Sequence, residues 1–204
     1  MKGIILELQT NALDEQITVE ELLRKAYLVA RKLQLKEFQK WIEDEQNGYA
    51  GKRVPDFRYI HGSYKALNPA IGWIPLMLSP KFEDLISKMP IDYPISQIQN
   101  LYNKNDGTIS FTPNAKIQQL LNQSIDFPID MAFSYQANSS ELYRILSTVR
   151  NKILEWAILL EENGIVGLEL SFSDKEKETA RNSEGIIQYT NNFFGTIDEA
   201  NFSQ

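Results

Sequence analysis

The 204-residue sequence contains no cysteine and a single histidine, His61. The lack of cysteine excludes disulfide bonds, thiolate zinc sites, iron–sulfur clusters and cysteine nucleophiles. One histidine leaves almost no room for a histidine-based catalytic triad or for a metal site with several histidine ligands. His61 lies in an alternating aromatic segment, so a partly exposed strand residue is a simpler interpretation than a general base.

Positive charge is also scarce, since 21 Lys and Arg residues stand against 27 Asp and Glu residues, giving a net charge of −6. Non-specific DNA binding requires several Lys or Arg side chains on phosphates, so this balance disfavours it. No stretch approaches the roughly 18 apolar residues that span a bilayer, and the apolar run at 3–6 is too short for a signal-peptide core. We therefore expect a cytoplasmic protein that does not bind a membrane.

Familiar catalytic signatures are missing as well. The glycines at 48, 51 and 62 do not have the spacing of a phosphate-binding or dinucleotide-binding loop. The acids at 43–45 and at 161–162 are consecutive, so on helices they point in different directions, as residues of a solvated face do. Asp126 and Asp130 form an equally weak pair. The sequence therefore indicates no catalytic residue, no metal site and no cofactor.

Amphipathic helices are predicted near the N-terminus. Thr18, followed three residues later by Glu21, has the pattern of a capping box, and apolar residues at three-to-four spacing continue to about residue 33. A second helix is predicted at about 35–46, with Gly48 as its stop. We expect residues 18–48 to form a helical hairpin whose apolar stripes face each other.

The middle of the chain, 49–137, has a mixed α/β pattern. Alternation at 57–65 predicts a strand. A second strand is predicted at 71–78, and it contains Pro75, which cannot donate a ladder hydrogen bond, so we expect this strand to lie at a sheet edge or to carry a bulge. Further strands are predicted at 108–112 and 128–136, and short helices at 80–88, 96–103 and 115–122.

The C-terminal part is predicted to contain a long helix at about 140–162, opened by a capping box of Asn138 and Glu141. A short strand at 165–170 and a β-prone tail at 185–204 follow. Such a tail would join the protein's own sheet, or pair with another copy or a partner by strand addition. The predicted fold class is α+β, with helices at both ends and a small, mainly antiparallel sheet, in one domain over residues 1–204.

Basic residues of the first hairpin include Arg24, Arg31 and Lys32. Arg24 and Arg31 are seven residues apart, so they share a helix face. The simpler interpretation is a solvated face with ion pairs such as Glu21–Lys25. A site for nucleic acid or for nucleotide phosphates is the alternative.

The three tryptophans, Trp41, Trp73 and Trp156, are most simply core residues. Trp41 and Tyr49 flank the polar stretch EDEQN, so the alternative is that one of these two rings is half exposed. A half-exposed ring would suit an interaction surface, where aromatic anchors concentrate binding energy.

Two stretches carry a resemblance to a known family. They are LLRKAYLVARKLQLKEFQKWIEDEQNGY at 22–49 and VRNKILEWAILLEENGI at 149–165. Together with the Phe57-Arg58 pair, GWIPL at 72–76 and NNFFG at 191–195, they resemble the AbiTii-domain family over roughly 18–195. The family takes its name from abortive infection, in which two small genes act together to halt phage growth.

The resemblance implies an anti-phage defence component that works with a partner protein. No catalytic residues are established for the family, so none is carried over. Candidate binding positions come from the basic helix face and from polar or aromatic matches to the family. They are Arg24, Arg31, Lys32, Trp41, Glu45, Asn47, Tyr49, Arg58, Trp73, Arg150 and Asn151.

These observations lead to three candidate functions. The first is a non-enzymatic defence component that binds a protein of the same system or a phage component, or that assembles with itself. The second is a nucleic-acid or nucleotide sensor that uses the basic helix face. The third is a carboxylate-dependent nuclease or toxin, which requires acids that converge only in the folded chain.

Overall fold

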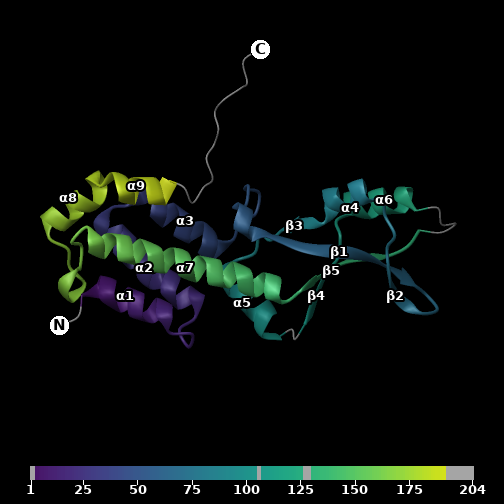
Figure 1. Cartoon of the computed structure of the whole chain (residues 1–204), viewed down its shortest axis with the longest axis horizontal. Coiled ribbons are helices and arrows are strands. Elements are labelled where there is room, and N and C mark those ends of the chain that lie inside the picture. Colours follow the sequence, from purple (N-terminus) through teal and green to yellow (C-terminus); the bar gives the residue numbers. More distant parts are fainter. Residues whose placement is uncertain (1–2, 105–106, 126–129, 192–204) are drawn as a thin grey trace, which may run out of the picture.

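The computed structural model describes residues 3–104, 107–125 and 130–191, and its fold is α+β, as predicted. Figure 1 shows an elongated molecule with a helical body at one end and an arm, built around a sheet, that extends from it. The body comprises α1 (Ile4–Leu13), α2 (Val19–Leu33), α3 (Lys36–Asn47), α5 (Ile95–Lys104), α7 (Ser140–Glu162), α8 (Asp174–Asn182) and α9 (Glu184–Asn191). The arm comprises β1 (Tyr59–Asn68), β2 (Gly72–Pro75), α4 (Pro80–Ile86), β3 (Lys88–Pro90), β4 (Thr108–Phe111), α6 (Ala115–Ser124) and β5 (Phe133–Asn138).

The predicted N-terminal hairpin is confirmed as α2 and α3. The Thr18 hydroxyl accepts a hydrogen bond from the Glu21 N–H at 3.2 Å, and the Glu21 carboxylate accepts one from the Thr18 N–H at 3.0 Å, which completes the capping box. Because Glu21 is used in this way, the predicted Glu21–Lys25 ion pair is replaced by a contact of 2.7 Å between Lys25 Nζ and Glu7 Oε1 on α1. Gly48, with φ of 87°, ends α3 as predicted.

The body buries its apolar stripes completely at the centre. Trp41 of α3 and Trp156 of α7 are fully buried, so their prediction as core residues is confirmed. The ring of Phe38 stacks on Trp156 with centroids 4.0 Å apart. Full burial of a large apolar side chain stabilises a fold by about 1.5–3 kcal/mol. The hairpin and the long helix α7 are therefore held together by aromatic packing.

The sheet of the arm is antiparallel, with β1 as its central strand and the order β2-β1-β5-β4. Strand β2 lies at the edge, which is one of the two alternatives that Pro75 predicts, although it is shorter than 71–78. Strand β3 also pairs with β1 and was not predicted, because it is only three residues long and ends in proline.

Side chains alternate across the sheet, so the two faces differ. Tyr64 and Ala66 of β1 are buried in one core cluster that includes Leu121 of α6. Ser63 and Leu67, which point to the other face, are exposed. The arm thus packs one face of its sheet and leaves the far end of the other face in solvent.

Two predictions near the C-terminus are wrong. Residues 165–170 form no strand, because positive φ values at Gly167, Glu169 and Leu170 bend the chain into a 3₁₀ turn. The β-prone residues up to Asn191 form α9, since Ile186 and Thr190 share a helix face and are buried against the body. The rest of the predicted tail, 192–204, lies outside the described residues.

Within the part of the chain that the structure describes, no helix is both long and apolar enough to cross a bilayer.

Candidate functional site

Polar contacts join body and arm at the point where β5 gives way to α7. Strand β5 pairs with β1 only from Gly62 onward, so the earlier residues of β1 have no strand along that edge. A side chain of α7 provides a hydrogen-bond partner at this edge: Glu141 Oε2 accepts a hydrogen bond from the His61 N–H at 3.1 Å. The predicted capping box of Asn138 and Glu141 is therefore wrong, because Glu141 turns to the sheet and not to the start of its own helix.

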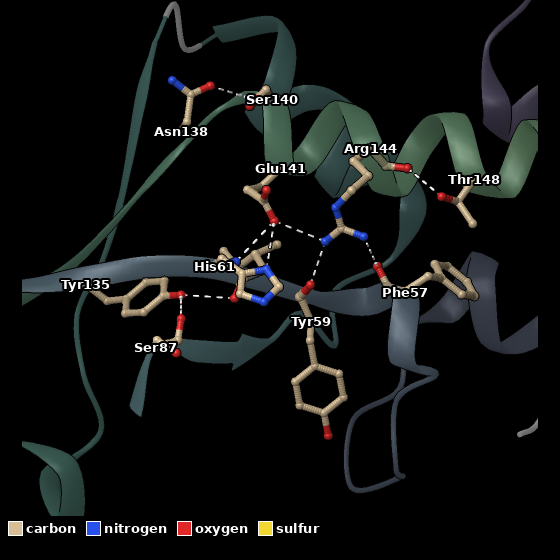
Figure 2. A network of polar contacts seen from close by, with 11 residues as sticks. Phe57, Tyr59, His61, Ser87, Tyr135, Asn138, Ser140, Glu141, Arg144 and Thr148 are labelled. Atoms are coloured by element: carbon tan, nitrogen blue, oxygen red, sulfur yellow. Dashed lines mark hydrogen bonds and ion pairs between the residues drawn. The ribbon is translucent and has the colours of Figure 1, made fainter. Parts of the chain in front are cut away.

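Arg144, one helical turn further along α7, also bonds to backbone groups at the edge that β5 does not reach (Figure 2). Its guanidinium donates to the Tyr59 carbonyl at 2.6 Å and to the Phe57 carbonyl at 3.1 Å, and it also lies 3.1 Å from Glu141 Oε2. Residues 57, 59 and 61 alternate along one edge of the chain, and side chains of α7 bond to the Phe57 and Tyr59 carbonyls and to the His61 N–H, which β5 does not reach. The long helix is thereby fixed to the root of the arm.

The His61 ring takes little part in this network. Its side chain is 60% exposed, and Nδ1 lies 3.7 Å from Glu141 Oε2. It borders a shallow hollow together with Asp56, Lys88 and Arg144. Burial would raise the pKa of Glu141, but hydrogen bonds from the His61 N–H and the Arg144 guanidinium outweigh it and lower that pKa.

Tyr135, on β5, contacts backbone carbonyls at the same junction between body and arm. Its hydroxyl lies 3.0 Å from the Ile60 carbonyl oxygen and 2.7 Å from that of Ser87 (Figure 2). The ring crosses Gly62, where a Cβ atom would stand only 2.7 Å from a ring carbon and 2.4 Å from the Gln136 carbonyl oxygen. Gly62 is thus required by close packing, and burial raises the pKa of Tyr135.

Three candidate binding residues meet in a buried cluster and not on the surface. Glu45 and Arg58 are fully buried and form an ion pair. The Tyr49 hydroxyl donates to Glu45 Oε1 at 2.7 Å, and Arg58 also donates to the Tyr93 carbonyl at 2.6 Å. Burial, followed by the Glu45 charge, raises the pKa of Tyr49. The cluster ties α3 to the start of β1, and all three of its side chains are buried.

Arg150 and Asn151 are adjacent on α7 but differ in their contacts. Arg150 donates to the carbonyl oxygens of Ala12 at 3.2 Å and Asp14 at 2.9 Å and also bonds to that of Ile17, so it holds the loop between α1 and α2. Asn151, next to it on α7, is exposed. Trp41 and Tyr49 both lie in the interior, so the core interpretation holds and the alternative of a half-exposed ring is wrong.

The basic helix face is exposed, but each candidate on it contacts a partner. Arg24 lies 2.5 Å from Glu20, Arg31 donates to the Tyr27 hydroxyl at 3.2 Å, and Lys32 bonds to the Leu170 carbonyl. Asn47, at the end of α3, bonds to the Glu43 carbonyl at 2.8 Å. Glu20 offsets the charge of Arg24, whereas the groups bonded to Arg31 and Lys32 are neutral and leave those positive charges in place.

The acids of the 43–45 run diverge in the folded chain. Glu43 accepts from the Tyr27 hydroxyl at 3.0 Å, Asp44 pairs with Lys52, and Glu45 pairs with Arg58. Among the described residues, no group of three or more His, Asp or Glu side chains is placed to hold a metal ion.

Exposed apolar side chains gather at the tip of the arm. We call residues 66–75, which are the end of β1, its turn and β2, the arm hairpin. Leu67 and Trp73 are cross-strand partners on the open face and are 39% and 44% exposed, and Ile71 in the turn is 73% exposed. The interpretation of Trp73 as a core residue is therefore wrong, because β2 is an edge strand with an uncovered face.

The sequence matches the AbiTii family model over residues 3–185. The chain belongs to the AbiTii family. This is an abortive-infection family, and membership indicates a role in bacterial defence against phage. No curated protein and no solved structure matches the chain.

Features that sequence reasoning missed lie within this AbiTii match. Glu141 and Arg144 carried no signal as sheet partners, because their contacts cross about 80 residues of chain. A second missed feature is the turn around Glu169 and Leu170, which both have positive φ. In this turn the side chains of Leu168 and Leu170 are 58% and 47% exposed. The uncharged run across the arm hairpin was the one visible clue to an exposed apolar surface.

Proposed function

We propose that this AbiTii-family chain is a non-enzymatic component of a cytoplasmic abortive-infection system and acts by binding protein through the arm hairpin. The observation that carries this proposal is the exposure of Trp73, Leu67 and Ile71 together at the tip of the arm. Interface cores are enriched in aromatic residues and depleted in charge, and a few such anchors supply most of the binding energy.

The composition of the hairpin supports the proposal. No residue in 66–80 is charged, although charged residues make up 24% of the chain. Exposed edge strands normally carry charges that discourage pairing with other chains, and β2 lacks them. Met77, two residues beyond β2, is 95% exposed and extends the apolar surface. A surface of this kind is suited to a protein partner, either from the same defence system or from the phage.

The two alternatives have weaker support. Arg24, Arg31 and Lys32 form the basic face, but each contacts a neighbouring group of its own chain. The acids of the 43–45 run point to three different partners and do not converge. The sensor and nuclease functions therefore rank below a protein-binding function.

Plaque formation on cells that express the protein together with its native neighbouring genes tests the proposal. Trp73→Lys places a charge on the arm hairpin and is expected to abolish protection against phage. Ile158→Lys is the matched control, because Ile158 is an apolar residue of the body with 39% exposure. Full protection by Trp73→Lys would contradict the proposal.

A second variant separates the leading function from the sensor. Replacing Arg24, Arg31 and Lys32 by Glu reverses the basic helix face and leaves the arm hairpin intact. We expect this variant to protect against phage as the unmodified protein does. Loss of protection, together with salt-dependent binding of nucleic acid by the unmodified protein, would favour the sensor.

A further inference from the structure

The free edge of β2 has a definite arrangement of hydrogen-bonding groups. The Leu67 N–H bonds to the Ala132 carbonyl on the β5 side at 2.8 Å. Backbone direction alternates along a strand, so Ala66 and its partner Ile74 face each other across β1 and β2. Trp73, the neighbour of Ile74, therefore directs both its N–H and its C=O away from the sheet.

We propose that this edge pairs with the same edge of a second copy of the chain, antiparallel, about a two-fold axis at Trp73. This inference rests on the proposed function of the arm hairpin. In this register each Trp73 N–H donates to the Trp73 carbonyl of the other copy, so one residue supplies both halves of a self-complementary pair. The two sheets become one continuous sheet, with β2 beside β2 at its centre.

The neighbouring residues confine the pairing to that register. Pro75 has no N–H and cannot donate to a second strand. The Ile71 N–H is turned inward to Asn68 Oδ1 at 3.3 Å, within its own hairpin. Only Trp73 offers both a donor and an acceptor to the outside, so a shifted register would lose one of the two hydrogen bonds.

Charge favours a second copy as the occupant. Two chains that each carry a net charge of −6 repel one another, and they meet with least repulsion where charge is absent. Residues 66–80 contain no charged side chain, so the two hairpins approach without a like-charge contact. The two Trp73 rings then lie on the same face as directly opposed cross-strand neighbours, beside Leu67 of each copy.

The first test is the mass of the full chain in solution by sedimentation velocity over a range of concentrations. We expect a monomer–dimer equilibrium for the unmodified protein and for Ile158→Lys. In Trp73→Lys two ammonium groups would face each other across the axis, and we expect association at least tenfold weaker.

A second test locates the interface. The chain has no cysteine, so Trp73→Cys introduces the only thiol. Directly opposed Cα atoms of a hydrogen-bonded pair are about 5.5 Å apart, which is within reach of a disulfide. On oxidation this variant should run as a covalent dimer on a non-reducing gel. Ser63→Cys, which is exposed on the same sheet face but away from the edge, should remain a monomer.

The outcomes distinguish this inference from the function on which it rests. A monomer at all concentrations that gives no Trp73→Cys cross-link overturns self-pairing. If Trp73→Lys also abolishes protection in that case, the hairpin binds a different protein and the proposed function stands. A dimer that survives Trp73→Lys and gives no cross-link overturns self-pairing too, because its interface lies elsewhere.

Discussion

In the body, α3 and α7 bury Trp41 and Trp156 completely, whereas in the arm β2 leaves Trp73 44% exposed. The difference follows from geometry. A helical hairpin and a long helix can each turn one apolar stripe inward and close a core on all sides. A sheet has two faces and two edges, and the short helices α4 and α6 lie on one side of it (Figure 1). The body therefore has a closed apolar core, whereas the arm retains an exposed apolar surface.

The contacts that join the body to the arm differ from the contacts inside the body. Apolar contacts fill the body, but polar groups hold the root of the arm, with Arg58 on the α3 side and Arg144 on the α7 side. Arginine suits this task because its planar guanidinium donates several hydrogen bonds to fixed acceptors. Substitutions at these positions are therefore expected to affect the junction between body and arm most directly.

The largest effect is expected for Arg58→Leu. It leaves Glu45 charged and unpaired in the interior, at a cost of about 3–5 kcal/mol, which is much of the stability of a typical domain. Urea denaturation followed by circular dichroism measures this loss. The Glu45→Leu/Arg58→Leu double variant should recover much of it, and Arg53→Leu, at a largely exposed side chain, is the control. A loss below about 1 kcal/mol for Arg58→Leu would show that the pair is not important for folding.

A smaller effect, of about 1–3 kcal/mol, is expected for Gly62→Ala, because the new Cβ overlaps Tyr135 and the Gln136 carbonyl. Thermal denaturation measures the size. Hydrogen exchange then shows where the effect lies, with faster exchange for β5 amides and unchanged protection in the centre of α7. Uniform loss of protection in both parts would mean that arm and body unfold as one unit. Ser63→Ala, on the open face, is the control.

Arg144→Ala removes the donor from the carbonyls of Phe57 and Tyr59. Water reaches this partly exposed site, so we expect a loss of about 1–2 kcal/mol, near the lower end for an unsatisfied buried group. Hydrogen exchange at residues 57–61 should increase most. Asn151→Ala, at an exposed position on the same helix, should match the unmodified protein, and equal effects of both variants would contradict the role of Arg144.

The smallest effect concerns the body alone and depends on pH. Burial would raise the pKa of Glu176, but N–H groups of Gly167, Val166 and Ser173 donate to its carboxylate and lower that pKa to about 2. Because the folded-state pKa lies below the unfolded value of 4.5, the carboxylate stabilises the fold above pH 4.5 and loses this effect as pH falls toward 2.

Glu176→Gln should therefore lower stability by about 1 kcal/mol at neutral pH, since the carboxyl is partly exposed and solvent screens it. The difference from the unmodified protein should shrink between pH 4.5 and 2. Urea denaturation at several pH values measures it, and a difference that does not change with pH would refute the assignment. Glu178→Gln, at an exposed position on the same helix, is the control.

Local patterns predicted local structure well when their partners were close in sequence. The Thr18–Glu21 capping box formed because both partners lie within one helical turn. The same spacing at Asn138 and Glu141 failed, because the sheet offered Glu141 the His61 N–H from 80 residues away. The site residues follow the same rule: the resemblance to the family indicates Arg58 and Glu45 as candidates, but only the fold shows that they pair in the interior.

The α+β class, the helices at both ends and the AbiTii family could be predicted from the sequence, and Pro75 limited its strand to a sheet edge or a bulge. These depend on residue periodicity, proline geometry and extended sequence similarity, which are all readable along the chain. Only the folded chain shows that the segment at 184–191 is a helix, that Arg58 is buried and that Trp73 is exposed. Those outcomes depend on which surfaces meet in space, since burial of a side chain is set by neighbours that are distant in sequence.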